Sequence, residues 1–262
     1  GEPLELVFAG IPNELPFRVE IEGREELTAM ANEALYASRS EETAEGKTLT
    51  FTYAPAPATE GPLTGFFIQK VFRFKDGEYP FDVEIRAGEG GAPLAAFVYF
   101  GPGFGADEGT KESQFHVREF VFGVSQGGRW LAERASKPDI LKASTQTEAG
   151  HLTGWIWKSL PYQPLGGGAV RLLQSAAWAA AGDNFFSAVA FSHEQFSEVR
   201  LKVARAEISA PAEEAEKKDT PAATVEAVAM GVPAAELQSV AYLPKDLRVI
   251  KPMGRGLDGL VN

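Results

Sequence analysis

The fold class follows from one stretch, GFFIQKVFRFKDGEYPFDVEIR, residues 65–86. Apolar and polar side chains alternate in residues 66–74 and again in residues 79–86, which is typical of β-strands with one buried and one solvated face. Between these runs, the dipeptide Asp76-Gly77 accepts the positive φ angles of a tight turn. The two runs therefore predict strands that pair antiparallel. The apolar side chains that define their buried faces are Phe66, Ile68, Phe72, Phe74, Tyr79, Phe81, Val83 and Ile85.

The rest of the chain continues this pattern. Short strand-like runs are separated by clusters of glycine, proline and aspartate, and no two runs are joined by the long helical crossover that a parallel sheet requires. Helical signals are confined to residues 24–34 and 244–251. We therefore expect an all-β fold, a large antiparallel β-sandwich with a short C-terminal helix. The further predicted strands are residues 14–21, 47–54, 94–100, 115–124, 151–160, 185–191, 198–208 and 224–230.

Size and charge narrow the classes of function. A chain of 262 residues with 44% hydrophobic residues can bury a core of its own. Its formal net charge of -11 repels phosphate backbones, which argues against a nucleic-acid partner. The longest apolar run, residues 176–181, is far shorter than the ~20 residues that a membrane-spanning helix needs. Residues 209–223 lack aromatic side chains and mix proline, alanine and charge, and so predict an exposed loop.

One short motif suggests a nucleophile. GVSQG, residues 123–127, matches the G-x-S-x-G elbow of α/β hydrolases, in which Ser125 would be the nucleophile. Its candidate partners, in the same chain order, are Asp139 and either His151 or His193. That elbow works only where a parallel strand runs into a helix. Because the surrounding pattern is antiparallel, a hairpin turn is the favoured interpretation.

The three histidines, His116, His151 and His193, offer a second catalytic hypothesis. No two of them have the spacing of paired metal ligands on one element, so we expect no metal site. Epimerases built on large β-sandwiches use histidines with a glutamate for proton transfer at the anomeric carbon of a sugar. A mutarotase-like, carbohydrate-active enzyme is therefore one alternative, although a histidine on a sheet face is more often a surface or packing residue.

Two tryptophans offer a binding hypothesis. Trp155 and Trp157 lie two residues apart and so share one face of a strand. There they would form an apolar platform for a carbohydrate or an extended peptide. Packing in the core explains the same spacing.

Three segments stand in a particular order: FRFKDGEYPFDVEI (residues 72–85), AAWAAAGDNFFSAVAF (176–191) and AYLPKDLRVIKPMGRGLDGLVN (241–262). Together they resemble the large periplasmic domain of YidC, the bacterial inner-membrane insertase of the YidC/Oxa/Alb family. The last segment is the specific part, because it is similar to the family patterns YxGPKxxxxL and GLDxxVDFG. Leu243 stands in place of the glycine of the first pattern and Asn262 in place of the aspartate of the second. The matching residues are Trp178, Phe185, Phe186, Tyr242, Pro244, Lys245, Gly256, Leu257, Asp258 and Val261.

The resemblance implies a super-β-sandwich of the galactose mutarotase-like kind, with no enzymatic role and no cofactor. It places the domain on the periplasmic face of the bacterial inner membrane, between the first two transmembrane helices of a multi-pass insertase. The domain would assist the insertion of nascent membrane proteins, which bind the membrane core that this chain lacks. It would also contact the SecD/SecF components of the Sec translocon.

The same resemblance divides the chain into a sandwich domain, residues 1–240, and a linker toward the following transmembrane segment, residues 241–262. Four basic and two acidic side chains give the linker a charge of +2 within a molecule of -11. This reversal would hold the linker near anionic lipid headgroups. Arg248 and Lys251 near a helix C-terminus also favour the helix dipole, which explains part of the pattern. The functional residues of the linker would be Tyr242, Pro244, Lys245, Leu247, Gly256, Leu257 and Asp258.

Overall fold

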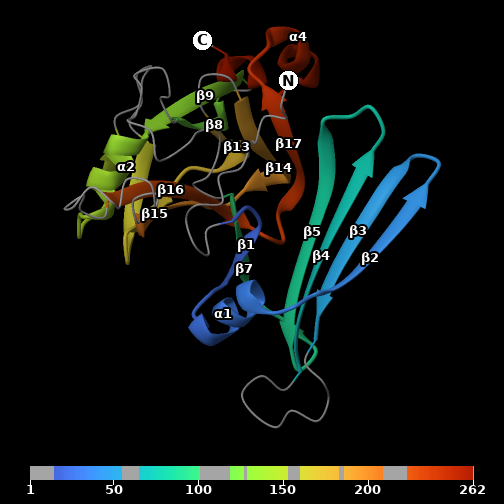
Figure 1. Ribbon diagram of the computed structural model, residues 1–262. Coiled ribbons are helices and arrows are strands. Elements are labelled where there is room, and N and C mark those ends of the chain that lie inside the picture. Colours follow the sequence, from blue (N-terminus) through green and yellow to red (C-terminus); the bar gives the residue numbers. More distant parts are fainter. Residues whose placement is uncertain are drawn as a thin grey trace, which may run out of the picture.

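The strands form two antiparallel sheets that pack face to face (Figure 1). The computed structural model describes residues 15–54, 65–100, 119–126, 129–152, 160–182, 186–208 and 223–261. All strand pairs among these residues are antiparallel. The predicted all-β class and the antiparallel sandwich with a short C-terminal helix are thus confirmed.

The order of the strands within each sheet is as follows. The seven-stranded sheet contains β1 (Arg18–Ile21), β7 (Ala96–Phe100), β16 (Ala223–Pro233), β15 (Val199–Ile208), β12 (Ala169–Leu172), β11 (Leu160–Gly166) and β10 (Gly150–Leu152). The ten-stranded sheet contains β2 (Ala37–Thr43), β3 (Gly46–Tyr53), β4 (Phe66–Lys75), β5 (Pro80–Glu89), β17 (Leu237–Pro244), β14 (Phe186–Phe196), β13 (Ala176–Gly182), β8 (Glu119–Gln126) and β9 (Arg129–Ser136), with β6 (Ala92–Pro93) paired to β5. The helical elements are α1 (Glu25–Glu33), α2 (Lys137–Ser144), α4 (Leu247–Ile250) and the 3-10 helices η1 (Lys251–Met253) and η2 (Leu257–Leu260).

The main core lies between the two sheets. Val98 and Leu201 of the seven-stranded sheet belong to the same buried cluster as Ile68 and Val240 of the ten-stranded sheet, and all four are fully buried. A second buried cluster lies on the opposite, outer face of the ten-stranded sheet. That sheet is therefore covered on both faces where β8, β13, β14 and β17 run.

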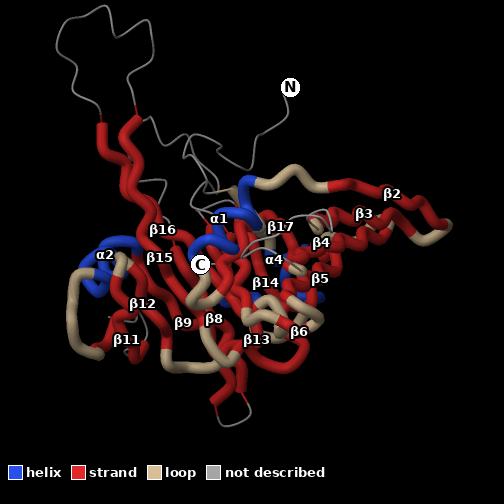
Figure 2. The backbone as a smooth tube through the Cα atoms, turned by 90° about the horizontal axis from the view of Figure 1, so that it is seen from below, coloured by secondary structure: helices blue, strands red, loops and turns tan. Residues whose placement is uncertain are grey.

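The predicted hairpin of residues 66–86 is confirmed as β4 and β5, with Phe72 opposite Val83 and a positive φ of 78° at Gly77. Strands β2 to β5 project from the sandwich as a long antiparallel wing (Figures 1 and 2). Near the tip of this wing, Phe74 and Tyr79 are 38% and 51% exposed. The expectation that these two side chains are buried was wrong, because the strands extend beyond the sheet that would cover them.

Several elements differ from the sequence-based expectations. The helix predicted at residues 24–34 is confirmed as α1. Helix α2, in contrast, was not predicted. The strand predicted at residues 151–160 begins as β10, and its last residue, Leu160, begins β11; the residues between lie outside the described part of the chain. The helix predicted at residues 244–251 is shorter, because β17 continues to Pro244 and α4 begins only at Leu247.

The C-terminal region is part of the sandwich. The predicted boundary at residue 240 falls inside β17, a central strand of the ten-stranded sheet. The predicted loop 209–223 joins β15 and β16, which are neighbours in the other sheet, and residues 209–222 lie outside the described part. Among the helices of the described residues, none has the length and apolarity to cross a bilayer.

Candidate functional site

The candidate site is the C-terminal element, residues 245–261, which packs on the outer face of the ten-stranded sheet beside β8, β9 and β17 (Figure 1). Its side chains Ile250, Leu257 and Leu260 are at most 1% exposed. Fully buried apolar side chains contribute roughly 1.5–3 kcal/mol each relative to exposed ones, so the element is firmly attached. The buried side chains of the sheet in this cluster are Val121, Ala177, Trp178, Ala180, Val189, Phe191, Ala241 and Leu243.

The element begins with a capped helical turn. The Asp246 side chain accepts a hydrogen bond from the Arg248 backbone N–H at 2.8 Å, and the Arg248 guanidinium donates to the same carboxylate at 2.6 Å. These hydrogen bonds hold the pKa of Asp246 below its ordinary value. Leu243, which stands in place of the family glycine, is fully buried in β17 and so belongs to the sheet rather than to the start of the helix.

Trp178 anchors the middle of the element. Its side chain is fully buried, and its indole N–H donates to the backbone carbonyl of Arg255 at 2.8 Å. The indole lies over Gly123 of β8, where an added β-carbon would overlap the ring. Gly123, the first glycine of the GVSQG motif, thus leaves room for Trp178, which contacts the C-terminal element.

Two glycines bring the end of the element close to β9. Gly256 has a left-handed φ of 72°, which favours glycine, and a β-carbon there would lie 2.6 Å from Trp130 Cβ. A β-carbon on Gly259 would overlap the side chain of Ala132. The glycine-rich tail is therefore packed rather than loose.

Glu119 interacts with two cationic side chains, Arg134 and Lys245, at the C-terminal element. The Arg134 guanidinium donates to the Glu119 carboxylate and to the backbone carbonyl of Gly259. Lys245 Nζ lies 3.9 Å from Glu119 Oε2, and the side chains of Arg134 and Lys245 are each 9% exposed. Lys245 is thus oriented toward the protein and away from solvent.

The other residues predicted to be functional, Tyr242 in β17 and Leu247 and Asp258 in the C-terminal element, differ in burial. Tyr242 stacks on Phe81 with ring centroids 6.0 Å apart, and burial raises its pKa to about 12. Leu247 is 49% exposed, and Asp258 is exposed beside the buried Leu257. Trp155 and Trp157 lie outside the described residues, and so does Asn262.

The nucleophile elbow is contradicted by the strand pairing. Ser125 of β8 lies opposite Trp130 of β9 in an antiparallel hairpin, where the elbow would need a parallel strand and a following helix. Asp139 instead accepts a hydrogen bond from the Ser136 hydroxyl at 2.7 Å at the start of α2. The hairpin interpretation is therefore confirmed.

The histidines do not converge in the described part of the chain. His151 lies in β10 of one sheet and His193 in β14 of the other, and both are exposed. His116 lies outside the described residues. Within the described ranges, no three histidine, aspartate or glutamate side chains are placed to hold a metal ion.

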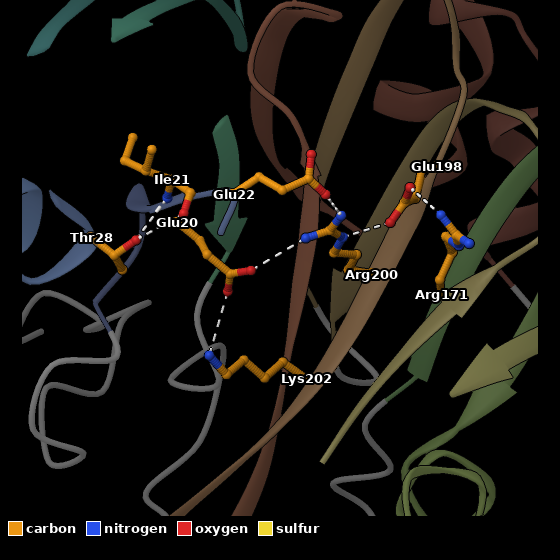
Figure 3. Close-up of polar contacts among 8 residues, drawn as sticks. All are labelled: Glu20, Ile21, Glu22, Thr28, Arg171, Glu198, Arg200 and Lys202. Carbon is orange, nitrogen blue, oxygen red and sulfur yellow. Dashed lines mark hydrogen bonds and ion pairs between the residues drawn. The ribbon is translucent and has the colours of Figure 1, made fainter. Parts of the chain in front are cut away.

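A second polar cluster, which sequence reasoning missed, centres on Arg200 on the outer face of the seven-stranded sheet (Figure 3). Its guanidinium contacts Glu198 at 2.5 Å, Glu22 at 2.6 Å and Glu20 at 3.3 Å, and it stacks 3.5 Å from the centroid of the Phe97 ring. Burial alone would lower the pKa of Arg200, but the hydrogen bonds to Glu198 and Glu22 outweigh it and raise the pKa above its ordinary value.

Two further cations complete this cluster. Lys202 Nζ lies 3.5 Å from Glu20, and Arg171 Nη1 lies 3.3 Å from Glu198 (Figure 3). Since each of the three cations faces a carboxylate, an added anion would have to displace a glutamate. The arrangement joins β1, β12 and β15 and so stabilises the sheet.

Lys70 of β4 is a half-buried cation in a different environment. Its Nζ donates to the backbone carbonyl of Phe17 at 2.9 Å and lies 5.3 Å from the centroid of the Tyr36 ring. None of the ion pairs among the described residues includes it. Burial therefore lowers the pKa of Lys70 to about 8.

We expect the free energy of unfolding to rise by about 2 kcal/mol between pH 8 and pH 10, because of Lys70. In this window the unfolded chain, in which lysine has an ordinary pKa, binds more protons than the folded chain. Lys70→Met removes the buried ammonium, and so it stabilises the protein at pH 7 and flattens the rise. Urea denaturation at several pH values checks this. The control is Lys47→Met, whose side chain is 47% exposed; identical pH profiles for wild type and Lys70→Met would contradict the prediction.

No family model matches the chain, and no curated protein matches it. The structure itself defines the class, a two-sheet antiparallel β-sandwich whose own C-terminal element closes the outer face of one sheet.

Proposed function

We propose that this chain is a non-catalytic domain on the periplasmic face of a bacterial membrane protein insertase, where it assists the insertion and folding of inner-membrane proteins. The observation that supports the proposal is the packing of the C-terminal element. The segment with the most specific family resemblance is also the one that is buried against the ten-stranded sheet, through Ile250, Leu257 and Leu260.

This packing gives the domain a mechanical role. An element fixed by buried apolar contacts and by the hydrogen bond from Trp178 to Arg255 moves with the sandwich as one body. In the insertase, such an element would hold the sandwich at a fixed orientation to the membrane core. The chemistry of insertion would then belong to the membrane core alone.

The exposed basic side chains of the element are candidates for contact with anionic lipid headgroups. Arg248 has a side chain that is 90% exposed, and Lys251 is exposed beside it. Lys245 is excluded from this role because it lies against Glu119. Contact with the SecD/SecF components is part of the same proposal and rests on the family resemblance.

The test compares a leucine of the C-terminal element with an exposed leucine of the sandwich in the full-length insertase. Leu257→Ala removes a fully buried side chain, whereas Leu173→Ala changes one that is 52% exposed. We expect Leu257→Ala to slow the insertion of a reporter inner-membrane protein severalfold, because the element loosens when a buried leucine is truncated. Leu173→Ala should leave the insertion rate unchanged. Equal insertion rates for wild type and Leu257→Ala would overturn the proposal, provided that both proteins reach the same level in the membrane.

The enzyme alternative has a direct test. The domain is incubated with α-glucose or α-galactose, and mutarotation is followed by NMR. We expect the spontaneous rate with and without protein, since His151 and His193 lie in different sheets. A faster rate that is lost in His193→Ala would favour the enzyme.

A further inference from the structure

The ten-stranded sheet is split between β5 and β17. These strands pair over only three positions, from Ala241 opposite Pro80 to Ser239 opposite Asp82. At the other end of β5, the two-residue strand β6 pairs with Gly88 and Glu89. Among the described residues, no strand pairs with residues 83–87 of β5 on the side away from β4.

The main chain of β5 faces this opening. The Ala87 carbonyl accepts a hydrogen bond from the Leu94 backbone N–H at 2.9 Å, which shows that Ala87 turns its polar groups away from β4. Successive residues of a strand turn these groups to opposite sides, so Ile85 turns its N–H and C=O the same way as Ala87. Within the described ranges, the backbone of Ile85 therefore forms a strand edge without a partner strand, in the middle of a sheet rather than at its margin.

The opening is a groove of about 890 Å³, within the range of ligand-binding clefts. Side chains of Phe67, Leu94 and Pro233 line it, and so does Gln238 of β17. Phe67 is 36% exposed and lies across Gly88, where a β-carbon would overlap its ring. The end of the groove near β6 is thus apolar.

The four charged side chains that line the groove on β4 and β5, namely Arg73, Asp82, Glu84 and Arg86, sum to zero charge. Arg73 Nη2 lies 2.7 Å from Glu84 Oε2, and the Arg86 guanidinium pairs with the same carboxylate. Hydrogen bonding from Arg73 holds the pKa of Glu84 below its ordinary value. Both arginines pair with Glu84, and with Asp82 beside them this part of the groove carries no net charge.

We propose that the groove between β5 and β17 binds a short extended segment of another polypeptide as an added strand on β5. A strand edge recognises main-chain N–H and C=O groups, and alternate side-chain pockets add selectivity. The open stretch of five residues spans roughly 17 Å, which matches a segment of about five residues. The segment would be uncharged where it passes Arg73, Glu84 and Arg86 and would place an apolar side chain against Phe67. This inference is independent of the proposed insertase function.

The probe is a blocked heptapeptide, acetyl-Thr-Val-Thr-Leu-Thr-Val-Thr-amide, at millimolar concentration. We expect it to slow the hydrogen exchange of the Ile85 amide, measured by NMR. Two analogues of the peptide, N-methylated either at the threonines or at the apolar residues, test whether β5 binds the peptide through main-chain hydrogen bonds. Methyl groups on the residues that face β5 should weaken binding at least tenfold, so at least one analogue must lose affinity.

A matched pair of variants locates the site. Ala235→Trp places a large side chain at the exposed rim of the groove and should weaken binding at least tenfold. Ala44→Trp makes the same change in the exposed turn between β2 and β3 and should have no effect. Unchanged exchange at Ile85 with the parent peptide, equal affinity of all three peptides, or equal binding by the two variants would each overturn the proposal. α-Glucose or maltose in place of the peptide should leave the exchange of Ile85 unchanged; slower exchange with these sugars would mean that the groove is not a peptide site.

Discussion

Trp178→Ala lowers the free energy of unfolding by about 4 kcal/mol and releases the C-terminal element from the sheet. The indole is fully buried between the sheet and residues 250–260, so its truncation to alanine removes a large volume from the packing there. The substitution also leaves the Arg255 carbonyl without its indole donor. Urea denaturation measures the loss of stability, and hydrogen exchange measures the release through the amides of Val249, Ile250 and Leu257.

The control for this prediction is Trp130→Ala in β9. Trp130 is 41% exposed, so its truncation should cost about 1 kcal/mol or less and leave the protection of the C-terminal amides intact. A conservative variant, Trp178→Phe, keeps most of the ring but removes the donor to Arg255, and should cost about 1–3 kcal/mol. If the amides of the C-terminal element stay protected in Trp178→Ala, the element is held by other contacts and our account of the site is wrong.

The two parts of the ten-stranded sheet differ in how far the sequence predicts them. Strands β4 and β5 can be predicted from the sequence because one face of each is exposed to solvent. Apolar and polar side chains therefore alternate along them with a period of two. In β13 both faces are buried: Ala179 and Ala181 lie in the main core, while Trp178 and Ala180 lie under the C-terminal element. A strand buried on both faces shows no alternation, and its alanines have a high helix propensity. The side-chain pattern of residues 176–181 therefore shows an apolar run but does not identify a strand.

The start of α2 and the environment of Lys70 each have a signal in the local sequence. Ser136 caps α2 by accepting a hydrogen bond from the Asp139 backbone N–H, and Pro138 occupies the first turn, so the start of that helix could have been found from its sequence. Lys70 occupies an even position in β4, on the same face as Ile68 and Phe72. A lysine on an apolar face indicates a buried or bridging cation.

The contacts of the candidate site cannot be predicted from local sequence patterns. The family resemblance singled out residues 242–258, but nothing local predicts that Gly123 and Trp178 would form the surface beneath them. These residues come from strands more than fifty positions apart, and only the sheet order brings them together. The same holds for the groove beside β5, which exists because two strands that pair at one end diverge at the other.

Arg200→Met is expected to lower the free energy of unfolding by about 3 kcal/mol at pH 7. Methionine keeps an unbranched apolar chain over Phe97, but the guanidinium that pairs with Glu198, Glu22 and Glu20 is lost. The Glu198 side chain is only 15% exposed and retains just the longer contact to Arg171. The cost therefore arises mainly from a buried carboxylate whose charge is no longer compensated.

That explanation makes one further outcome measurable by urea denaturation. Adding Glu198→Gln to Arg200→Met should recover much of the lost stability, since a buried ion pair replaced on both sides is often nearly neutral. The control is Arg39→Met, which breaks an exposed pair with Glu41 on β2 and should change stability by about 0.5 kcal/mol or less. A double variant no more stable than Arg200→Met would show that packing on Phe97, rather than charge compensation, is what Arg200 contributes.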